Sequence, residues 1–170
     1  MCLKIPGRIP LRTALVLLLL VIGQHPVTAA GVEIPLADNL AEIGQLSRQQ
    51  NIPAIVFVSR DACPYCRMLR DTTLRPMFMA DKFEQQAILV EVSLDRVHPM
   101  TGFDNSQVTA KAFGEFYNAG ITPTLLFLDS EGREIGKRLV GISNLELYGY
   151  YLQKSIDEAL LTIRSETPRG

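Results

Sequence analysis

The sequence predicts an α/β domain built around a mixed sheet of about four strands, with helices on both faces. Two observations predict it. Apolar strand patterns alternate with helical patterns along the chain, and a turn signal joins the third strand to a fourth. Strands separated by helices are expected to run parallel, and the final hairpin should add an antiparallel edge. The 170 residues provide a core for one such domain but not for two.

Residues 1–30 have the order of a secretory signal peptide. Three basic residues precede an apolar run at 14–22, and small residues that suit a signal peptidase follow at 27–31. The apolar run is about half of the roughly 20 residues that a membrane-spanning helix needs. We therefore expect cleavage after Ala29 or Ala30 and export to the periplasm.

The mature domain is expected at 31–164, with a flexible tail at 165–170. Cleavage removes Cys2 and leaves Cys63 and Cys66. A disulfide between cysteines this close in sequence would close too small a loop to stabilise a domain. Redox chemistry in an oxidising compartment is therefore the natural interpretation. The net charge of −1 gives no reason to expect a nucleic-acid partner.

The sequence of the first half of the domain predicts a helix, a strand and a second helix. Apolar residues recur at helical spacing over 36–50, and a continuous apolar run at 52–58 suits a strand buried on both faces. The next helix should begin at Cys63 or Pro64, because the first helical turn tolerates the missing N–H of proline. Pro76 is expected to end or kink it, with a further turn or two afterwards.

The second half predicts, in order, a strand, a loop, a helix, two strands joined by a turn and a last helix, at 88–94, 96–105, 106–117, 124–128, 134–140 and 143–163. The helix at 106–117 should bury Phe113 and Phe116 on its apolar face. Ser143 and Glu146 fit a capping box that would open the last helix.

The cysteine pair fits thiol–disulfide exchange, in which one thiolate attacks a substrate disulfide and a second thiol resolves the mixed disulfide. Cys63 would lie at the start of the helix, where unpaired N–H groups and the helix dipole favour a thiolate. Cys66 would lie one turn further along. We predict that Cys63 is the nucleophile and Cys66 the resolving thiol.

The motif Cys63-Pro64-Tyr65-Cys66 after a buried strand resembles the active site of the thioredoxin superfamily. The resemblance implies the thioredoxin fold, thiol:disulfide oxidoreductase activity and no cofactor beyond the cysteine pair itself. It also implies that the exposed Pro64 and Tyr65 meet the substrate.

Two further segments carry the same resemblance. Thr122 and Pro123 stand just before the third buried strand, where thioredoxin-like proteins have a cis-proline that faces the dithiol. Gly141 lies in a loop that resembles the one entering the last helix and completing the substrate groove. The resemblance therefore adds Thr122, Pro123 and Gly141 to the substrate-binding residues.

Overall, the chain is most similar to periplasmic thioredoxin-like proteins of bacteria, including the reductase type associated with sulfur oxidation. This similarity implies a monomer that exchanges disulfides with exported proteins and is re-reduced by a membrane electron-transfer partner. The residues do not fix the direction of electron flow, and we favour a reductase.

One departure from thioredoxin concerns proton handling. Thioredoxin carries a buried aspartate on its first central strand, and Phe57 stands at that position here. Glu91 falls on the next strand, where thioredoxin has a lysine. We hypothesise that Glu91 supplies the acid–base group at the resolving thiol. The alternative is that Glu91 points into solvent.

Two other functions remain open. A copper carrier could use Cys63, Cys66 and His98, whereas a structural zinc site would need four ligands and is not expected. A chaperone-like module could bind clients in the groove around Pro123, with redox turnover incidental.

Overall fold

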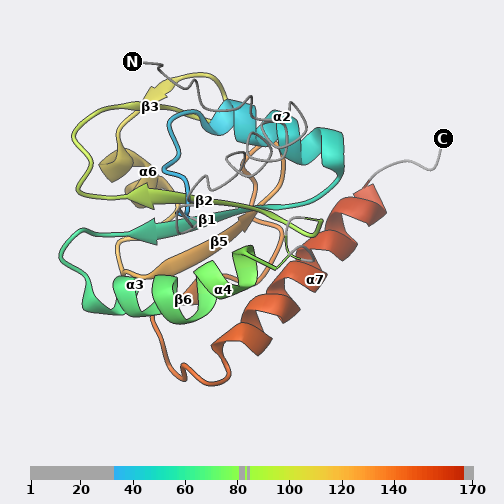
Figure 1. Cartoon of the computed structure of the whole chain (residues 1–170). Helices are drawn as coiled ribbons and strands as arrows, with labels where there is room; N and C mark the ends of the chain where they lie inside the picture. Colours follow the sequence, from blue (N-terminus) through green and yellow to red (C-terminus); the bar gives the residue numbers. More distant parts are fainter. Residues whose placement is uncertain (1–32, 81–82, 84, 167–170) are drawn as a thin grey trace, which may run out of the picture. The chain divides into compact units, whose positions relative to one another are not determined.

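The computed structural model describes residues 33–80, 83 and 85–166, so the predicted signal peptide at 1–30 and the end of the predicted tail lie outside the described residues. The main sheet contains β1 (Ala54–Ser59), β2 (Ile88–Ser93), β5 (Thr124–Leu128) and β6 (Leu139–Val140). The helices are α2 (Leu40–Gln50), α3 (Pro64–Leu69), α4 (Arg75–Phe78), α6 (Ala110–Phe116) and α7 (Tyr148–Glu166) (Figure 1). A π-helical turn, η1 (Arg70–Leu74), joins α3 to α4, and β3 (Met100–Thr101) pairs with β4 (Gln107–Val108) in a separate hairpin.

The sheet is mixed, with strand order β2-β1-β5-β6. β1 runs parallel to β2 and antiparallel to β5, and β6 pairs antiparallel with β5. The predicted fold class is confirmed, but the expectation that β5 runs parallel to the other helix-separated strands is wrong. The connection from β2 to β5 contains the β3–β4 hairpin as well as α6, so it is not the simple strand–helix–strand crossover on which the expectation rested.

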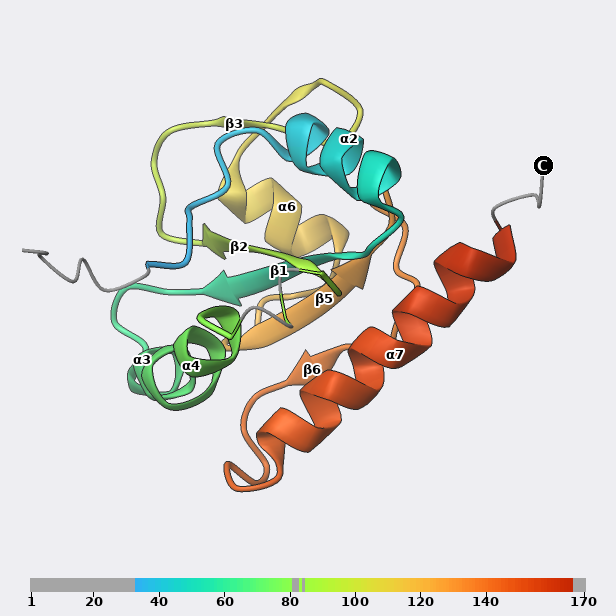
Figure 2. The same cartoon turned by 45° about the vertical axis from the view of Figure 1, so that its right-hand side comes forward.

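Helices cover both faces of the sheet, as Figure 2 shows: α2 and α6 lie on one side, and α3, α4 and α7 on the other. Successive β1 side chains alternate between the two cores, because strand side chains point to opposite faces. Ile55 and Phe57 pack on the side of α3 and α7, whereas Val56 and Val58 pack on the side of α2 and α6. Every residue of β1 is buried, and each large apolar side chain there contributes about 1.5–3 kcal/mol through burial.

The first described helix is shorter than predicted. α2 begins at Leu40 because the side chain of Asn39 caps it, accepting hydrogen bonds from the N–H groups of Ala41 and Glu42. Leu36, predicted inside this helix, instead forms a parallel bridge with Glu91 beside β2. Its apolar side chain matches the helical period, but its backbone pairs with the sheet instead of forming helix.

The helical run that follows the cysteines passes through Pro76 and ends at Phe78, so the proline lies two residues before its end. Pro76 lies in the first turn of α4, where a missing N–H costs little. The departure from α-helical hydrogen bonding lies one turn earlier, in η1. Pro76 therefore correctly indicated an irregular helix, although the irregular turn precedes the proline.

Three predictions around α6 are wrong. The segment 96–105, expected as a loop, contributes β3 to the small hairpin. α6 then begins at Ala110, because Thr109 caps it by accepting a hydrogen bond from the N–H of Ala112. Phe113 is buried as expected, whereas Phe116 is 77% exposed. The buried residues of this short helix are Ala110, Phe113 and Gly114.

The C-terminal elements also differ at their ends. β6 pairs at only two residues, although Glu134 bridges Leu128 further back in the same hairpin. α7 begins at Tyr148 rather than at Ser143, and Asn144 accepts a hydrogen bond from the N–H of Leu147 in the turn before it. α7 extends to Glu166, so the tail predicted from 165 begins as helix. Among the described residues, no helix has the length and apolarity needed to cross a membrane.

Candidate active site

The two cysteines lie where β1 passes into α3. Cys63 is the N-cap residue of α3, with an extended backbone, and Pro64 occupies the first helical turn. The Cα atoms of Cys63 and Cys66 are 5.2 Å apart, and their sulfur atoms form a disulfide. The helix begins where the sequence predicted, because Pro64 needs no donor there.

The two sulfur atoms have different surroundings. The Cys66 side chain is fully buried, whereas Cys63 is 8% exposed and can be reached from solvent. The sulfur of Cys63 accepts a hydrogen bond from the N–H of Cys66 at 3.1 Å and one from the hydroxyl of Thr122 at 3.6 Å. Donors of this kind favour the thiolate over the thiol. The geometry therefore suits Cys63 as the attacking sulfur and Cys66 as the internal one.

Thr122 contacts Cys63, and Gly141 is hydrogen-bonded to Pro123, the residue that follows Thr122. The peptide bond between Thr122 and Pro123 is cis, and Pro123 is buried. The N–H of Gly141 donates to the carbonyl of Pro123 at 2.8 Å, which extends the pairing of β5 with β6 by one residue. Gly141 has φ of +64°, a conformation that favours glycine. The structure thus joins these three residues to one another and brings Thr122 to the dithiol, and their role in substrate binding stays a prediction.

Pro64 and Tyr65 occupy the exposed side of the first turn of α3. Tyr65 is 61% exposed, so its ring is open to a partner rather than packed in the core. Ile121, which precedes Thr122, is an exposed apolar side chain that sequence reasoning did not single out. Its position next to Thr122 in the sequence could have identified it as part of this surface.

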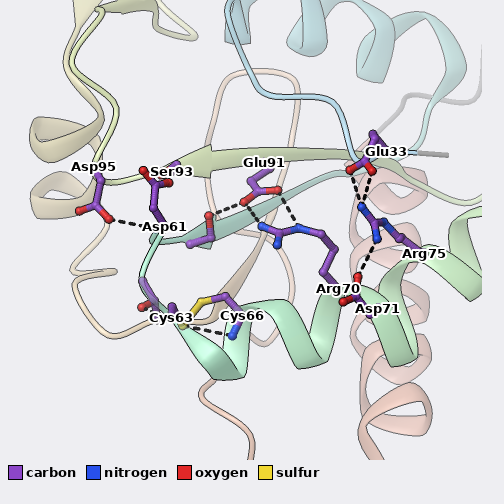
Figure 3. A network of polar contacts seen from close by, with 12 residues as sticks. Glu33, Asp61, Cys63, Cys66, Arg70, Asp71, Arg75, Glu91, Ser93 and Asp95 are labelled. Carbon is purple, nitrogen blue, oxygen red and sulfur yellow. Dashed lines mark hydrogen bonds and ion pairs between the residues drawn. A yellow bond between two sulfur atoms is a disulfide. The ribbon is translucent and has the colours of Figure 1, made fainter. Parts of the chain in front are cut away.

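Glu91 is buried, with 6% of its surface exposed, so the alternative that it points into solvent is wrong. Its carboxylate accepts hydrogen bonds from the hydroxyl of Ser59 and from the guanidinium of Arg70 (Figure 3). No role was expected for Ser59 from the sequence. An acid–base role for Glu91 stays a prediction.

Polar residues of β2 and of the turn that follows it hold both sides of the cysteine motif. Ser93, two residues beyond Glu91, donates to the carboxylate of Asp61 at 2.9 Å in the loop before Cys63. Asp95 accepts hydrogen bonds from the backbone N–H of Asp61 and from the guanidinium of Arg60, both at 2.9 Å. Figure 3 shows these contacts on one side of the disulfide and the Arg70–Glu91 pair on the other. The loop before α3 and the turn after it are thus fastened to the same strand.

His98 does not join the cysteines. It is exposed in the loop that follows β2. Within 33–80, 83 and 85–166, no three histidine, cysteine or acidic side chains are grouped so that they could hold a metal ion. The three-ligand arrangement considered for a copper carrier is therefore not formed in the described part of the chain.

Solved structures similar to this chain include an oxidoreductase and two thioredoxins. DsbH oxidoreductase is 19% identical, with a TM-score of 0.53, and the match covers 83% of this chain and 92% of that one. Mitochondrial thioredoxin 3 from Saccharomyces cerevisiae, in its oxidized form, is 18% identical, with a TM-score of 0.49 and coverage of 73% and 93%. Thioredoxin O2 from Arabidopsis thaliana, in its oxidized state, is 17% identical, with a TM-score of 0.47 and coverage of 72% and 94%. At these identities the likeness concerns the fold.

No curated protein matches the sequence significantly. The model of the thioredoxin-like domain family, however, matches residues 42–156, which include both cysteines, Glu91, Pro123 and Gly141. This match spans most of the chain, and the Cys63–Cys66 disulfide lies at the start of the helix that follows the central strand. The chain therefore belongs to the thioredoxin-like domain family and is a thiol:disulfide oxidoreductase.

Proposed function

We propose that this protein is exported to the periplasm and there reduces disulfides of other exported proteins through Cys63 and Cys66. The observation that carries the exchange chemistry is the asymmetry of the two sulfurs. Cys63 reaches solvent and accepts two hydrogen bonds, whereas Cys66 is fully buried one turn further along α3. One sulfur can meet a substrate, and the other can react only within the protein.

The reaction follows from this asymmetry. The thiolate of Cys63 attacks one sulfur of a substrate disulfide, which forms a mixed disulfide and releases the other substrate sulfur as a thiolate. The thiolate of Cys66 then attacks the sulfur of Cys63. This step forms the Cys63–Cys66 disulfide and releases the second substrate sulfur. Two electrons pass to the substrate, and a donor dithiol must return them for another cycle.

The substrate would lie along the surface formed by Pro64, Tyr65, Thr122, Pro123 and Gly141. Tyr65 supplies an exposed ring on one side of the cysteines, and the segment from Thr122 to Pro123 supplies backbone on the other. Because backbone contacts read no particular side chain, such a surface suits extended segments of many proteins. We therefore propose exported proteins as the substrate class.

The proposals of export and of an external electron donor are based on the sequence. The basic stretch, apolar run and small residues within 1–30 support a cleaved signal peptide. A reductase in an oxidising compartment needs electrons from elsewhere, so we propose a membrane electron-transfer partner as the donor. The dithiol itself is the redox centre, and we propose a monomer that needs no further cofactor.

Trapping variants test the exchange chemistry. In Cys66→Ser, Cys63 can attack but nothing resolves the adduct, so a mixed disulfide with a disulfide-bonded substrate protein should accumulate. In Cys63→Ser, the remaining thiol is buried and no adduct should form. Equal trapping by both variants would contradict the assigned roles. If the variant lacking both cysteines still held unfolded clients in solution as well as the unchanged protein does, the chaperone-like function would replace exchange.

The reduction potential tests the direction of electron flow. A value near the roughly −270 mV of thioredoxin would support a reductase, and a value near the roughly −120 mV of DsbA would make this protein an oxidant. Fractionation of the producing bacterium and N-terminal sequencing test export. We expect a periplasmic product that begins at Ala30 or Gly31.

A further inference from the structure

A surface cavity of about 720 Å³ adjoins the two segments that meet at the Cys63 sulfur. Its lining includes Arg60, which is three residues before Cys63, and Ile121, which directly precedes Thr122. The hydroxyl of Thr122 lies 3.6 Å from the Cys63 sulfur, so the lining begins one residue away from a direct contact with that sulfur. The volume is within the usual range of ligand sites. Part of a substrate bonded to Cys63 could therefore occupy this cavity.

The cavity is closed on one side and open on the other. Leu94, which follows β2, is fixed to the sheet because its N–H donates to the carbonyl of Ser59 at 2.9 Å. A Cβ on Gly114 of α6 would come within 2.8 Å of the Leu94 side chain, so helix and sheet meet closely there. A Cβ on Gly120, in contrast, would meet no atom within 4 Å. The space available to a ligand thus lies beside Gly120.

Ile121 supplies an exposed apolar surface to the cavity. Its side chain is 67% exposed. Its backbone is held in place, because the hydroxyl of Thr124 donates to the Ile121 carbonyl at 2.7 Å, and Thr124 is buried. A side chain that covered Ile121 would remove apolar surface from water without having to order a loose segment of this protein. Ile121 is therefore a ready contact for an apolar group.

The charged side chains that line the cavity already have partners in the described part of the chain. The guanidinium of Arg60 donates to Asp95 at 2.9 Å, and the ammonium of Lys111 lies 3.8 Å from the carboxylate of Glu115. The side chains of Lys111 and Glu115 are 82% and 68% exposed, so water weakens their effect on a nearby group. The lining consequently favours an apolar side chain over a charged one.

A substrate bonded to Cys63 begins next to this cavity. In the mixed disulfide, the substrate cysteine is held at the Cys63 sulfur, and each further residue of an extended chain spans about 3.3–3.6 Å. Ile121 is therefore within reach of substrate residues one or two positions from that cysteine. We propose that the cavity is a substrate subsite for an apolar side chain, such as leucine, at one of these positions, and that Ile121 determines this specificity.

The proposal rests on the disulfide exchange of the proposed function and narrows its substrate class. Exported proteins with an apolar residue beside the reacting cysteine would be preferred over those with glycine or a charged residue there. Backbone contacts along Thr122 and Pro123 would hold the chain, and the cavity would read one of its side chains.

A set of peptides tests this preference. Each peptide carries one cysteine, in a disulfide with thionitrobenzoate, among glycines, and leucine replaces one glycine at either of the two positions before or after the cysteine. In the reduced full-length protein, the Cys63 thiolate attacks the peptide sulfur and thionitrobenzoate leaves as a coloured thiolate. Cys66 then attacks Cys63 and releases the peptide thiolate. At one position or more, leucine should raise the second-order rate constant about tenfold, as expected for an apolar contact in a pocket.

Two variants alter the subsite in different ways. Ile121→Ala removes the exposed apolar side chain, and Gly120→Gln places a polar side chain in the open space, where its Cβ meets no other atom. In both, the ratio of the rates with the leucine and all-glycine peptides should fall from about tenfold to less than about twofold. This ratio cancels any change in the reactivity of Cys63. Leu161→Ala is the matched control, because Leu161 is also 67% exposed but lies on α7. It should keep the full ratio.

Three results would overturn the subsite. The first is equal rates with leucine and glycine at every position, and the second is a leucine preference that survives both Ile121→Ala and Gly120→Gln. The third is a stronger preference for aspartate that Lys111→Met abolishes, since this would make the cavity an anion site. In each case the all-glycine peptide would still report exchange, so the proposed function would stand. Thionitrobenzoate release that Cys63→Ser leaves unchanged would refute the exchange and the subsite together.

Discussion

The hydroxyl of Thr122 donates a hydrogen bond to the sulfur of Cys63, with oxygen and sulfur 3.6 Å apart. Thr122 precedes the cis peptide bond to Pro123, and Cys63 caps α3, so the contact joins two segments that are far apart in the sequence. Thr122, which we propose offers backbone to a substrate, thus also contributes to the environment of the Cys63 sulfur.

Thr122→Val keeps the shape of the side chain but removes this donor. We expect the rate of disulfide exchange at neutral pH to fall roughly two- to fivefold, as expected for a hydrogen bond of about 0.5–1 kcal/mol that favours the thiolate. The midpoint of the rate against pH should move upward. Thr122→Ser retains a hydroxyl and is the matched control. If both variants exchange at the same rate, the hydroxyl does not stabilise the thiolate.

Gly141→Ala should lower the free energy of unfolding by about 1–2 kcal/mol, because its φ of +64° is disfavoured for residues with a Cβ. An added Cβ would meet no atom within 4 Å, so the cost is conformational rather than steric. Urea unfolding measures it. Gly120 has equally open space but no positive φ, so Gly120→Ala should change stability by less than about 0.5 kcal/mol. Equal losses in both variants would contradict this explanation.

The Asn39 cap of α2 should contribute about 1 kcal/mol to the free energy of unfolding. Asn39→Ala leaves the N–H groups of Ala41 and Glu42 without their side-chain acceptor, and we expect the free energy of unfolding to fall by that amount. Asn39→Asp keeps an acceptor and should be nearly neutral. A similar loss in both variants would show that some other contact of Asn39 matters more than the cap.

Tyr117 should make the fold sensitive to alkaline pH. Burial raises its pKa to about 12, with a further contribution from the negative charges of Asp129 and Glu134. The pKa of a tyrosine in an unfolded chain is about 10. Between pH 10 and pH 12, therefore, the unfolded chain has released a proton that the folded chain retains. Stability should therefore be unaffected below pH 10 and should fall as pH rises through this window.

Tyr117→Phe tests that dependence. The variant should be about 1 kcal/mol less stable at neutral pH, because the hydroxyl donates to the carbonyl of Gly132 at 2.7 Å. It should also lose less stability than the unchanged protein on going to alkaline pH. Part of the decline should remain, since burial raises the pKa of Tyr148 as well. Identical alkaline slopes in urea unfolding would rule out a contribution from Tyr117.

The active-site helix shows what could be predicted locally. Pro64 needs no donor in a first helical turn, so it marked the start of α3, and the spacing of Cys63 and Cys66 placed both sulfurs within bonding reach. The continuous apolar run at 124–128 likewise gave β5 its observed bounds. Such signals depend on a few neighbouring residues, which is why they survive folding unchanged.

Element ends and strand direction were less predictable. Leu36 and Phe116 both fitted an apolar helical face, yet one lies beside β2 and the other is exposed. β5 runs antiparallel to β1, and the connection that leads to it contains a hairpin whose strands are only two residues long. These outcomes are set by competition between backbone pairing and packing, which apolar periodicity does not report.

The sequence by itself determined that the chain forms a helix-flanked mixed sheet with a cysteine pair at a helix start, because period, proline position and spacing are local properties. Only the tertiary structure decided that Arg70 is the counter-ion of Glu91 and that Thr122 faces Cys63. Each of those contacts joins different elements. Their formation depends on which helix face packs against which strand, and that is fixed by burial of the whole core rather than by any short segment.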